Sequence, residues 1–459
     1  MIRITLPGST PVRKGAYSMD MIALVYCAVV AGAAPLGSDA AAGSTVMAEP
    51  VAVADEAPQA AALEDLETRI VALEEARRIG DSVTAGEKGF AIRSADGAWR
   101  LGLRGVLQLD TREYLGRCAP VFVDTFFLKQ ARMVWDVQGY DRVSLKFVPD
   151  FGNGKAVIID AYAEGRLRPE LRVKAGKSKP PIALERLQGD AVVAFTERGV
   201  TQILTPSRDI GYSLLGTVGG GLLSYEAGIY NGAADGDSPD ADTAERKEFA
   251  GRIFAHPLRA LGVRALNALG VGVGGSIGDR VGSTAAPGVA SYKTPAQQTM
   301  FSYRSTVLAD GEQARVAPQG YWYAGPAWVL GEFVRSVQRV RVGSSRATLT
   351  AGGWQAAGGV VVTGEAASYD GLAPAGRCGA VEVAGRFGQV EFDSKAFPVY
   401  ADPAASVRAI RSWGADVNWW VRKAVRLSLE YDDSKFLGGA TRGRRTREQA
   451  VLTRVQVIL

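Results

Sequence analysis

The stretch RLGLRGVLQLDTR, residues 100–112, alternates two kinds of side chain along most of its length. Leucine occupies positions 101, 103, 107 and 109, whereas arginine, glutamine or aspartate occupies positions 100, 104, 108, 110 and 112. A period of two is the period of a β-strand, in which successive side chains point to opposite faces. The stretch therefore predicts a strand with one apolar and one polar face. The same period recurs at residues 127–138, 142–147, 223–230, 381–387, 425–432 and 451–459.

Strands with two such faces suit either a soluble sandwich or a transmembrane barrel. In a sandwich the apolar face forms the core and the polar face meets water. In a barrel the apolar face meets lipid and the polar face lines a lumen. Charges that continue along whole strands favour the barrel. So do aromatic residues near strand ends, such as Trp413, Trp419 and Trp420, because aromatic girdles mark the membrane interfaces of barrels.

Turn lengths and composition support the barrel as well. The expected turns are tight at one end of the strands and longer at the other, as at residues 231–247. Beyond the N-terminal region, no stretch offers the ~20 apolar residues that a spanning helix needs, so a membrane role requires a closed barrel. The formal net charge of +5 fits a positive lumen better than a cation channel.

Residues 171–211, LRVKAGKSKPPIALERLQGDAVVAFTERGVTQILTPSRDIG, interrupt the alternation. They begin as a strand, which Pro180 and Pro181 end because proline donates no ladder hydrogen bond. About thirty residues without a clear period then precede Asp209, and a loop of this length is usually functional or disordered. Apolar residues and several cations share the loop, which predicts a charged loop folded against the protein.

Three motifs within this loop resemble the phosphate-selective porin O and P family of outer-membrane channels. They are KPPIALERLQ at 179–188, FTER at 195–198 and PSRDIG at 206–211. The segment is similar to the third loop of that family, which folds into the barrel and narrows the pore. The resemblance covers roughly residues 88–459. Its other matching stretches are Ile159–Tyr162, Phe301–Arg304, 317–336, 361–371 and 413–420.

The resemblance implies an all-β fold, a transmembrane antiparallel β-barrel of about 16 strands. Our count gives about 17 candidate strands, and single-chain bacterial barrels use even numbers. Eighteen strands are possible if Gly89–Ser94 forms a strand of its own. The barrel is expected over residues 88–459, with the inward-folded loop at about 179–208. Along residues 127–138 we expect Phe127 on the apolar face with Met133 and Trp135.

The N-terminal region predicts three segments before the barrel. Arg13 and Lys14 precede an apolar run and then small residues suited to cleavage, which indicates a secretory signal peptide at 1–40. Residues 41–62 have the composition of a linker. Residues 63–80 form a short coiled-coil-like helix with leucine or isoleucine at heptad positions, which either supports a trimer or is a frayed solvent helix. Cys118 and Cys378 are either paired or free.

The candidate site consists of charged residues expected in the lumen. Alternation places cations of several strands there, and arginine and lysine supply the fixed charge and donors that anion selection needs. Each of them alone is more often a solvated charge without a special role. By resemblance, Arg186 matches the family's loop cation and Asp160 its strand aspartate. The candidate pore-lining or anion-binding residues are Arg104, Lys129, Arg132, Lys146, Asp160, Arg172, Lys174, Lys177, Lys179 and Arg186.

One departure from the family puts phosphate selectivity in doubt. The two serines that follow the loop cation in the family fall at Gly189 and Asp190 here. Two hydroxyl donors are thus missing, and a carboxylate repels phosphate unless it accepts a proton from it. The sequence supports an anion channel more strongly than a phosphate-specific one.

We therefore expect a channel of the bacterial outer membrane for passive diffusion of small anions, with phosphate or polyphosphate as candidates. The alternatives are a non-selective or structural barrel and, with less support, a barrel enzyme. His256 is the one histidine, no nucleophile motif accompanies it, and a surface role suits it better than catalysis. Expected partners are small inorganic anions, outer-membrane lipids and copies of the chain in a homotrimer. No cofactor, metal or nucleic acid is expected.

Overall fold

A computed structural model describes residues 65–71, 82–86, 89–116, 122–242, 246–263 and 265–459. The chain divides into two units, Met1–Arg69 and Ile70–Leu459. Residues 65–71, at the boundary of the two units, are helical, and they fall within the helix predicted at 63–80. The predicted signal peptide and linker lie outside the described residues, as does Cys118, so these assignments stay predictions.

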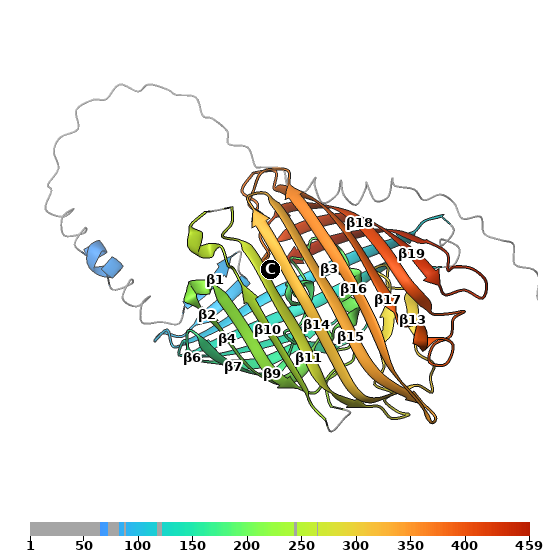
Figure 1. The fold of residues 1–459 in the computed structure, drawn as a ribbon. Helices are drawn as coiled ribbons and strands as arrows, with labels where there is room; N and C mark the ends of the chain where they lie inside the picture. Colours follow the sequence, from blue (N-terminus) through green and yellow to red (C-terminus); the bar gives the residue numbers. More distant parts are fainter. Residues whose placement is uncertain (1–64, 72–81, 87–88, 117–121, 243–245, 264) are drawn as a thin grey trace, which may run out of the picture. The chain divides into compact units, whose positions relative to one another are not determined.

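The second unit is a closed antiparallel β-barrel of 16 strands, which confirms the predicted fold class (Figure 1). Each strand pairs with the next, and β20 pairs with β3 to close the ring. The ring strands are β3 (Trp99–Tyr114), β4 (Thr125–Gly139), β5 (Val143–Asp150), β6 (Val157–Arg168), β7 (Leu171–Ser178), β8 (Asp209–Val218), β9 (Leu223–Tyr230), β10 (Glu248–Ala255), β11 (Leu269–Val281), β14 (Leu308–Ala324), β15 (Ala327–Val342), β16 (Ser345–Val361), β17 (Ala380–Phe392), β18 (Val407–Arg422), β19 (Val425–Gly438) and β20 (Glu448–Ile458).

Two further strands, β1 (Ser82–Gly86) and β2 (Gly89–Arg93), form a hairpin beside the ring. Strand β2 pairs with Arg100–Leu103 of β3, whereas β20 pairs with the same strand from Val106 onward. The predicted strand at Gly89–Ser94 therefore exists, but it extends one edge of β3 and does not enter the ring. This position explains why the barrel has 16 strands rather than 18.

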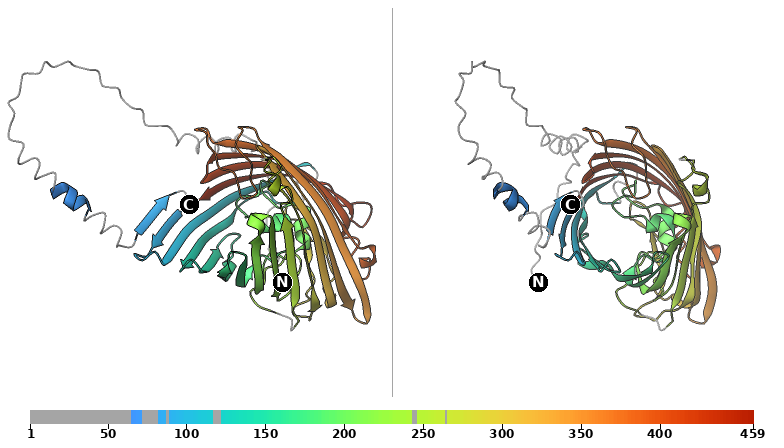
Figure 2. Two further views of the ribbon diagram at one scale, coloured as in Figure 1. Left: turned by 60° about the vertical axis from the view of Figure 1, so that its left-hand side comes forward. Right: turned by 90° about the vertical axis from the view of Figure 1, so that its left-hand side faces the viewer.

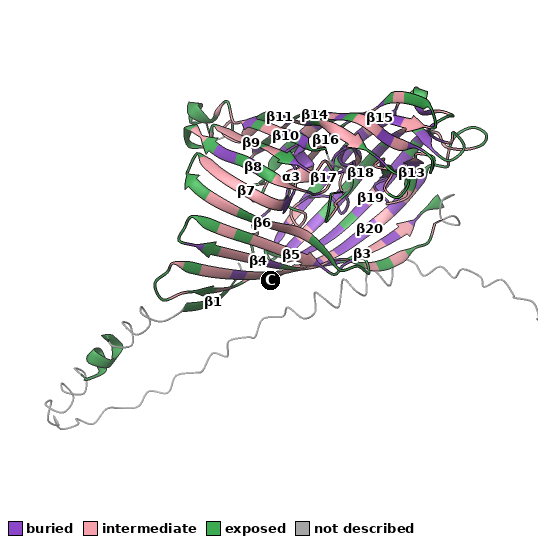
Figure 3. Cartoon of the chain, turned by 90° about the horizontal axis from the view of Figure 1, so that it is seen from below, coloured by how far each residue is buried: buried purple, intermediate pink, exposed green. Residues whose placement is uncertain are grey.

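Burial along the strands is reversed relative to a soluble protein. In β3, Leu107 and Leu109 are 47% and 44% exposed, whereas Gln108 and Asp110 are 0% and 1% exposed. Figure 3 shows such changes of exposure from residue to residue along the strands. Apolar side chains in these numbers on the outside of a sheet mark a surface that meets lipid, with the polar face turned to the lumen.

Strand β4 departs from simple alternation at one point. Its register against β3 shifts between Gln108 and Leu109, so Lys129 is an extra residue in a bulge. Phe127 pairs with Asp110, and the Arg112 guanidinium lies 5.0 Å from its ring centroid. Phe127 therefore shares the lumen face, and its predicted place beside Met133 and Trp135 was wrong.

Connections at the two ends of the barrel differ in length. At one end the strands join through short turns, although residues 256–268 and 362–379 are longer. The opposite end carries the long loops, which bacterial barrels usually turn to the outside of the cell. These are residues 179–208, 231–247, 282–307 and 393–406. Within the described ranges, no helix is long and apolar enough to cross a membrane.

The loop at residues 179–208 lies inside the ring, where Figure 2 (right) shows its green helical turns. It contains α3 (Leu184–Leu187) and the 3-10 helix η2 (Val200–Leu204). Ile182, Val200 and Leu204 are almost fully buried in one apolar cluster with residues of loop 282–307. That second loop carries the small hairpin of β12 (Ser291–Lys293) and β13 (Thr299–Ser302).

Candidate functional site

The loop 179–208 is fixed across the lumen by side chains of the barrel wall. Wall residues of β14, β18, β19 and β20 donate hydrogen bonds to carbonyls of the loop backbone. Because these carbonyls have no strand partner, the wall satisfies groups that would otherwise be costly to bury. The bonds run from Gln319 to Ile182 (2.7 Å), from Arg426 to Val193 (2.7 Å), from Asn418 to Ala194 (2.8 Å) and from Gln456 to Ala191 (3.0 Å).

The loop 362–379, from the end of the barrel with mostly short turns, also contacts the loop 179–208. The Tyr369 hydroxyl donates to the Leu184 carbonyl at 2.6 Å, and the Gln188 side chain donates to the Tyr369 carbonyl at 2.9 Å. The Leu184 amide donates to Glu332 of β15 at 2.8 Å. Helix α3 is thus held between the barrel wall and a loop from the opposite end of the barrel.

Beside this loop lies a cavity of about 550 Å³. Its lining contains seven basic and four acidic residues, so basic groups exceed acidic ones by three. The basic residues are Lys129, Arg132, Arg186, Arg198, Arg208, Lys293 and Arg454. The acidic residues are Asp190, Glu197, Asp235 and Asp237.

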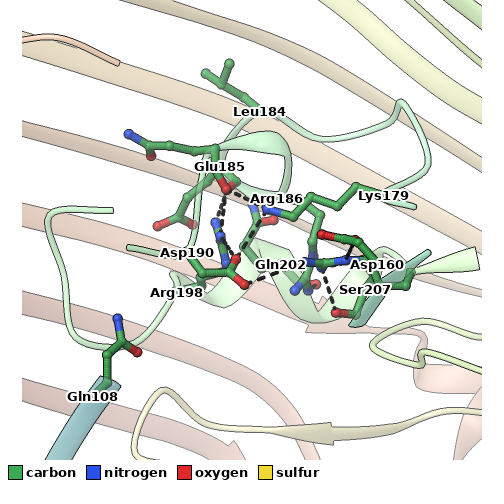
Figure 4. A network of polar contacts seen from close by, with 12 residues as sticks. Gln108, Asp160, Lys179, Leu184, Glu185, Arg186, Asp190, Arg198, Gln202 and Ser207 are labelled. Carbon is green, nitrogen blue, oxygen red and sulfur yellow. Dashed lines mark hydrogen bonds and ion pairs between the residues drawn. The ribbon is translucent and has the colours of Figure 1, made fainter. Parts of the chain in front are cut away.

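The Asp190 carboxylate lies among four cations, which we name the Asp190 cage. Figure 4 shows Asp190 with two of them, Lys179 and Arg198. Its Oδ1 is 2.5 Å from Arg198 Nη2 and 3.2 Å from Lys179 Nζ. Its Oδ2 is 2.6 Å from Arg132 Nη1 and 3.6 Å from Arg208 Nη2. Each oxygen therefore contacts two cations.

Other acceptors orient the same four cations. Arg132 Nε donates to Asp150 at 2.7 Å, and Arg208 Nε donates to Asp160 at 2.6 Å. The Gln188 carbonyl accepts from Lys179 at 2.7 Å and from Arg198 at 2.9 Å. Arg198 also donates to the Glu185 carbonyl. The cage is therefore held by more than the Asp190 carboxylate.

Burial and charge shift the pKa values within this loop. Burial acts to raise the pKa of Asp190, but Lys179, Arg132, Arg198 and Arg208 outweigh it and hold this pKa well below its ordinary value. Burial lowers the pKa of Lys179 to about 7, against the opposing attraction of Asp190. Asp190 is thus ionised at neutral pH, whereas Lys179 gains or loses its proton near pH 7.

Arg186, the loop cation that the family resemblance highlights, is not one of the cations that contact Asp190. Its guanidinium donates to the Gln202 carbonyl, and it makes no ion pair with a described residue. Burial lowers its pKa to about 9, and its side chain lines the cavity. Arg186 therefore presents a positive charge to the cavity without a carboxylate partner.

Glu197, in the same loop, is held by a second group of partners. Its Oε1 is 2.5 Å from Lys129 Nζ and 3.2 Å from Arg112 Nη2. Its Oε2 accepts from Gln297 of loop 282–307 at 3.3 Å. Burial acts to raise the pKa of Glu197, but the attraction of Lys129 and Arg112 outweighs burial. The net result is a pKa below the ordinary glutamate value. Glu197 ties the loop to β3, β4 and the loop 282–307.

Most of the other predicted residues form ion pairs away from the cage. Arg104 pairs with Asp136, and Lys146 makes no ion pair with any residue in the described part of the chain. Lys177 contacts loop 231–247 and does not line the cavity. The remaining pairs are Arg172 with Glu164 (2.7 Å), Lys174 with Glu226 (2.5 Å) and Lys177 with Asp240 (2.6 Å).

Thus Asp160, Arg132, Lys179 and, through Glu197, Lys129 come together around one loop. Sequence reasoning did not place Arg198 and Arg208 in the site, although both belong to the motifs FTER and PSRDIG. Their presence in those motifs was the available signal. Their contact with Asp190 depends on how the loop folds back on itself.

The described residues of the site supply charged groups and amides. His256 lies in the turn after β10, with its Nε2 3.0 Å from the Tyr321 hydroxyl. No group of histidine, cysteine, aspartate and glutamate in the described ranges is arranged to hold a metal ion. Cys378 is an exposed free thiol.

The sequence profile of the phosphate-selective porin O and P family matches residues 123–458 of the chain. The match covers well over half of the sequence, including the loop 179–208 and the strands β4 to β20. No curated protein sequence matches the chain significantly.

Solved structures of outer-membrane proteins share the fold. OmpT of Vibrio cholerae, in its trimer form, has a TM-score of 0.52 at 12% identity and covers 79% of this chain and 100% of that chain. The outer membrane channel DcaP of Acinetobacter baumannii gives 0.51 at 11%, covering 79% and 98%. An anion-selective porin from Comamonas acidovorans gives 0.50 at 9%, covering 79% and 100%. At these identities the likeness concerns the fold alone.

Proposed function

The chain belongs to the phosphate-selective porin O and P family and is a channel of the bacterial outer membrane, and on this premise we propose that small anions diffuse passively through its lumen. Phosphate and polyphosphate are the candidates that the family suggests. The loop 179–208 narrows the passage, and anions pass the cations that line the cavity beside it. No covalent step is required, because the gradient drives the movement.

One observation carries this proposal, the excess of basic over acidic residues in the cavity lining. Fixed positive charge inside a low-dielectric wall raises the local concentration of anions and repels cations. Arg186 contributes most directly, since its charge has no carboxylate partner among the described residues. Lys293, which also lines the cavity, and Lys146 on β5 likewise make no ion pair with a residue in the described part of the chain.

A second candidate, a non-selective or structural barrel, draws on a different observation. Most of the predicted lumen cations are paired with carboxylates, for example Lys174 with Glu226 at 2.5 Å. Loops from both ends of the barrel also meet inside it, at Leu184 and Tyr369. Paired charges attract anions less strongly, and a filled lumen conducts little.

Trimeric assembly belongs to the proposal as well. The Vibrio cholerae protein with the same fold is described in a trimer form. We propose that this chain also forms a homotrimer in outer-membrane lipids. The mass of the purified, detergent-solubilised protein, measured by light scattering with the detergent subtracted, distinguishes a trimer from a monomer.

Single-channel currents in a planar bilayer test the proposed function. Under a potassium chloride gradient, the reversal potential of the purified full-length protein should take the sign of chloride preference. Arg186→Ala should reduce that preference, whereas Arg346→Ala, which removes an exposed charge outside the cavity, should leave it unchanged. A reversal potential near zero supports the non-selective channel, and folded protein without current supports the structural barrel.

A further inference from the structure

We infer that the Asp190 cage is an oxyanion-binding site occupied by the chain's own carboxylate. The ligand class that it fits is a small multivalent oxyanion such as phosphate. This inference rests on the proposed function, because it concerns how tightly a permeating anion is held. Asp190 acts as a tethered competitor that keeps the binding of such anions weak.

The geometry of the cage is that of an oxyanion site. Both carboxylate oxygens contact two cations each, at distances from 2.5 to 3.6 Å. Guanidinium groups present planar forks of donors that match phosphate oxygens, and an ammonium group adds a compact charge. Three of the four cations, Arg132, Arg198 and Arg208, are arginines, which is the residue best suited to this recognition.

The cage also has reason to persist without the Asp190 carboxylate. Arg132 and Arg208 retain Asp150 and Asp160, and Lys179 and Arg198 retain the Gln188 carbonyl. When Lys179 is protonated, the four cations face three carboxylates, Asp190, Asp150 and Asp160, so removal of Asp190 leaves an excess of two positive charges. A dissolved oxyanion is the natural replacement for that missing charge.

The cage is open to a dissolved ion. Asp190, Arg132, Arg198 and Arg208 all line the cavity of about 550 Å³, and the Asp190 side chain is 17% exposed. A group held on the same chain acts at a high effective concentration, so it outcompetes a free anion present at low concentration. Weak binding lets an anion leave as readily as it enters, which conduction requires.

The test is block of chloride current by inorganic phosphate in single channels of the full-length protein. Asp190→Ser removes the carboxylate and leaves both space and a hydroxyl donor. We expect the phosphate concentration for half block to fall at least about tenfold relative to the wild type, because two or more charge-assisted hydrogen bonds become available. Asp190→Asn removes the charge but keeps the volume, so its half-block concentration should fall less.

The matched control is Asp237→Ser, which removes a carboxylate that lines the same cavity outside the cage. It should leave the half-block concentration within about threefold of the wild-type value. The double variant Asp190→Ser, Arg132→Gln should lose most of the gain. The folding of every variant is verified by heat-dependent migration on gels before currents are recorded. If Asp190→Ser does not fold, Asp190→Asn takes its place in the test.

Several outcomes overturn the inference. Unchanged block in both Asp190 variants contradicts an occupied oxyanion site, and an equal gain in Asp237→Ser reduces the effect to general charge. The reversal potential of the wild type tests the proposed anion preference separately from the phosphate block. Anion preference without increased block in the variants leaves the anion channel intact and removes the tethered competitor, whereas absent anion preference contradicts the proposed function itself.

Discussion

Asp190 and Glu197 are carboxylates of the same loop, seven positions apart, and each is surrounded by cations, yet their partners differ in origin. Three of the four cations around Asp190 come from the loop itself, and only Arg132 belongs to a strand. Both cations around Glu197 belong to the wall, Arg112 on β3 and Lys129 on β4. Asp190 therefore closes the loop on itself, whereas Glu197 fastens the loop to the barrel.

A carboxylate paired with cations therefore has a different role at each of the two positions. Removal of Glu197 leaves Arg112 and Lys129 without an ion pair to another described residue, with Arg112 only 9% exposed, and it removes one of the attachments of the loop to the wall. Removal of Asp190 leaves four cations that each keep another acceptor. We expect the first change to be felt mainly in stability and the second mainly in anion binding.

The largest expected effect is that of Glu197→Ala on the free energy of unfolding. Breaking a buried ion pair by removing one partner typically costs about 3–5 kcal/mol, because the remaining charge stays buried. Urea unfolding of the protein in detergent micelles, followed by tryptophan fluorescence, measures this loss. Glu170→Ala, at an exposed carboxylate in the turn between β6 and β7, should change stability by less than about 0.5 kcal/mol. Equal losses in both variants would show that Glu197 does not fasten the loop.

A smaller effect is expected when phosphate is added to variants of the two carboxylates. Phosphate should stabilise Asp190→Ser by about 1–3 kcal/mol at concentrations well above its dissociation constant. It should stabilise Glu197→Ser less, since only two cations remain there. The shift of the urea midpoint with phosphate, relative to the same ionic strength of chloride, provides the measurement. A larger phosphate-dependent shift of the urea midpoint in Glu197→Ser than in Asp190→Ser would contradict this prediction.

Charge titration within the cage should produce a weaker, pH-dependent effect. With the pKa of Lys179 at about 7, its positive charge is lost as pH rises from 6 to 8, and chloride preference should fall with it. Reversal potentials at these two pH values should fall more in the wild type than in Lys179→Met. His256→Gln should behave like the wild type, which distinguishes Lys179 from the histidine at the barrel end.

The same pKa shift has a stability consequence of defined sign. The folded-state pKa of Lys179 lies below the ordinary lysine value of 10.5, so between about 7 and 10.5 the unfolded chain binds more protons than the folded one. The contribution of Lys179 to stability therefore rises with pH across this range and is lost as pH falls through about 7. Urea midpoints at pH 6.5 and 9 should show a smaller rise in Lys179→Met than in the wild type.

The smallest effect is expected at the wall pair of Arg172 and Glu164, which lies outside the cage. Arg172 is 31% exposed, and an ion pair in such a place typically contributes about 0–1 kcal/mol. Arg172→Gln should leave both the urea midpoint and the phosphate block close to the wild type. A loss as large as that of Glu197→Ala would place the important charges on the wall rather than on the loop.

Local pattern predicted the strands, because a strand shows its two faces in its own sequence, and the family resemblance then favoured a barrel over a sandwich. The leucines and polar residues of β3 lie on opposite faces of the sheet, as their alternation indicates. The long stretch without a period, between the prolines at 180–181 and Asp209, marks the loop inside the barrel. Strand number was less certain, because pairing rather than pattern excludes β2 from the ring.

Tertiary structure alone decided which charges meet. Alternation assigns a face within one strand, but the bulge at Lys129 moved Phe127 to the lumen, and only pairing with β3 reveals such a bulge. Asp190 meets Arg132, which is 58 residues away, because β4 and the returning loop are brought together when the ring closes. Coulomb interaction depends on distance in space and on burial. The sequence by itself therefore determined a charged loop within a barrel, and the fold determined that this loop carries its own counter-anion.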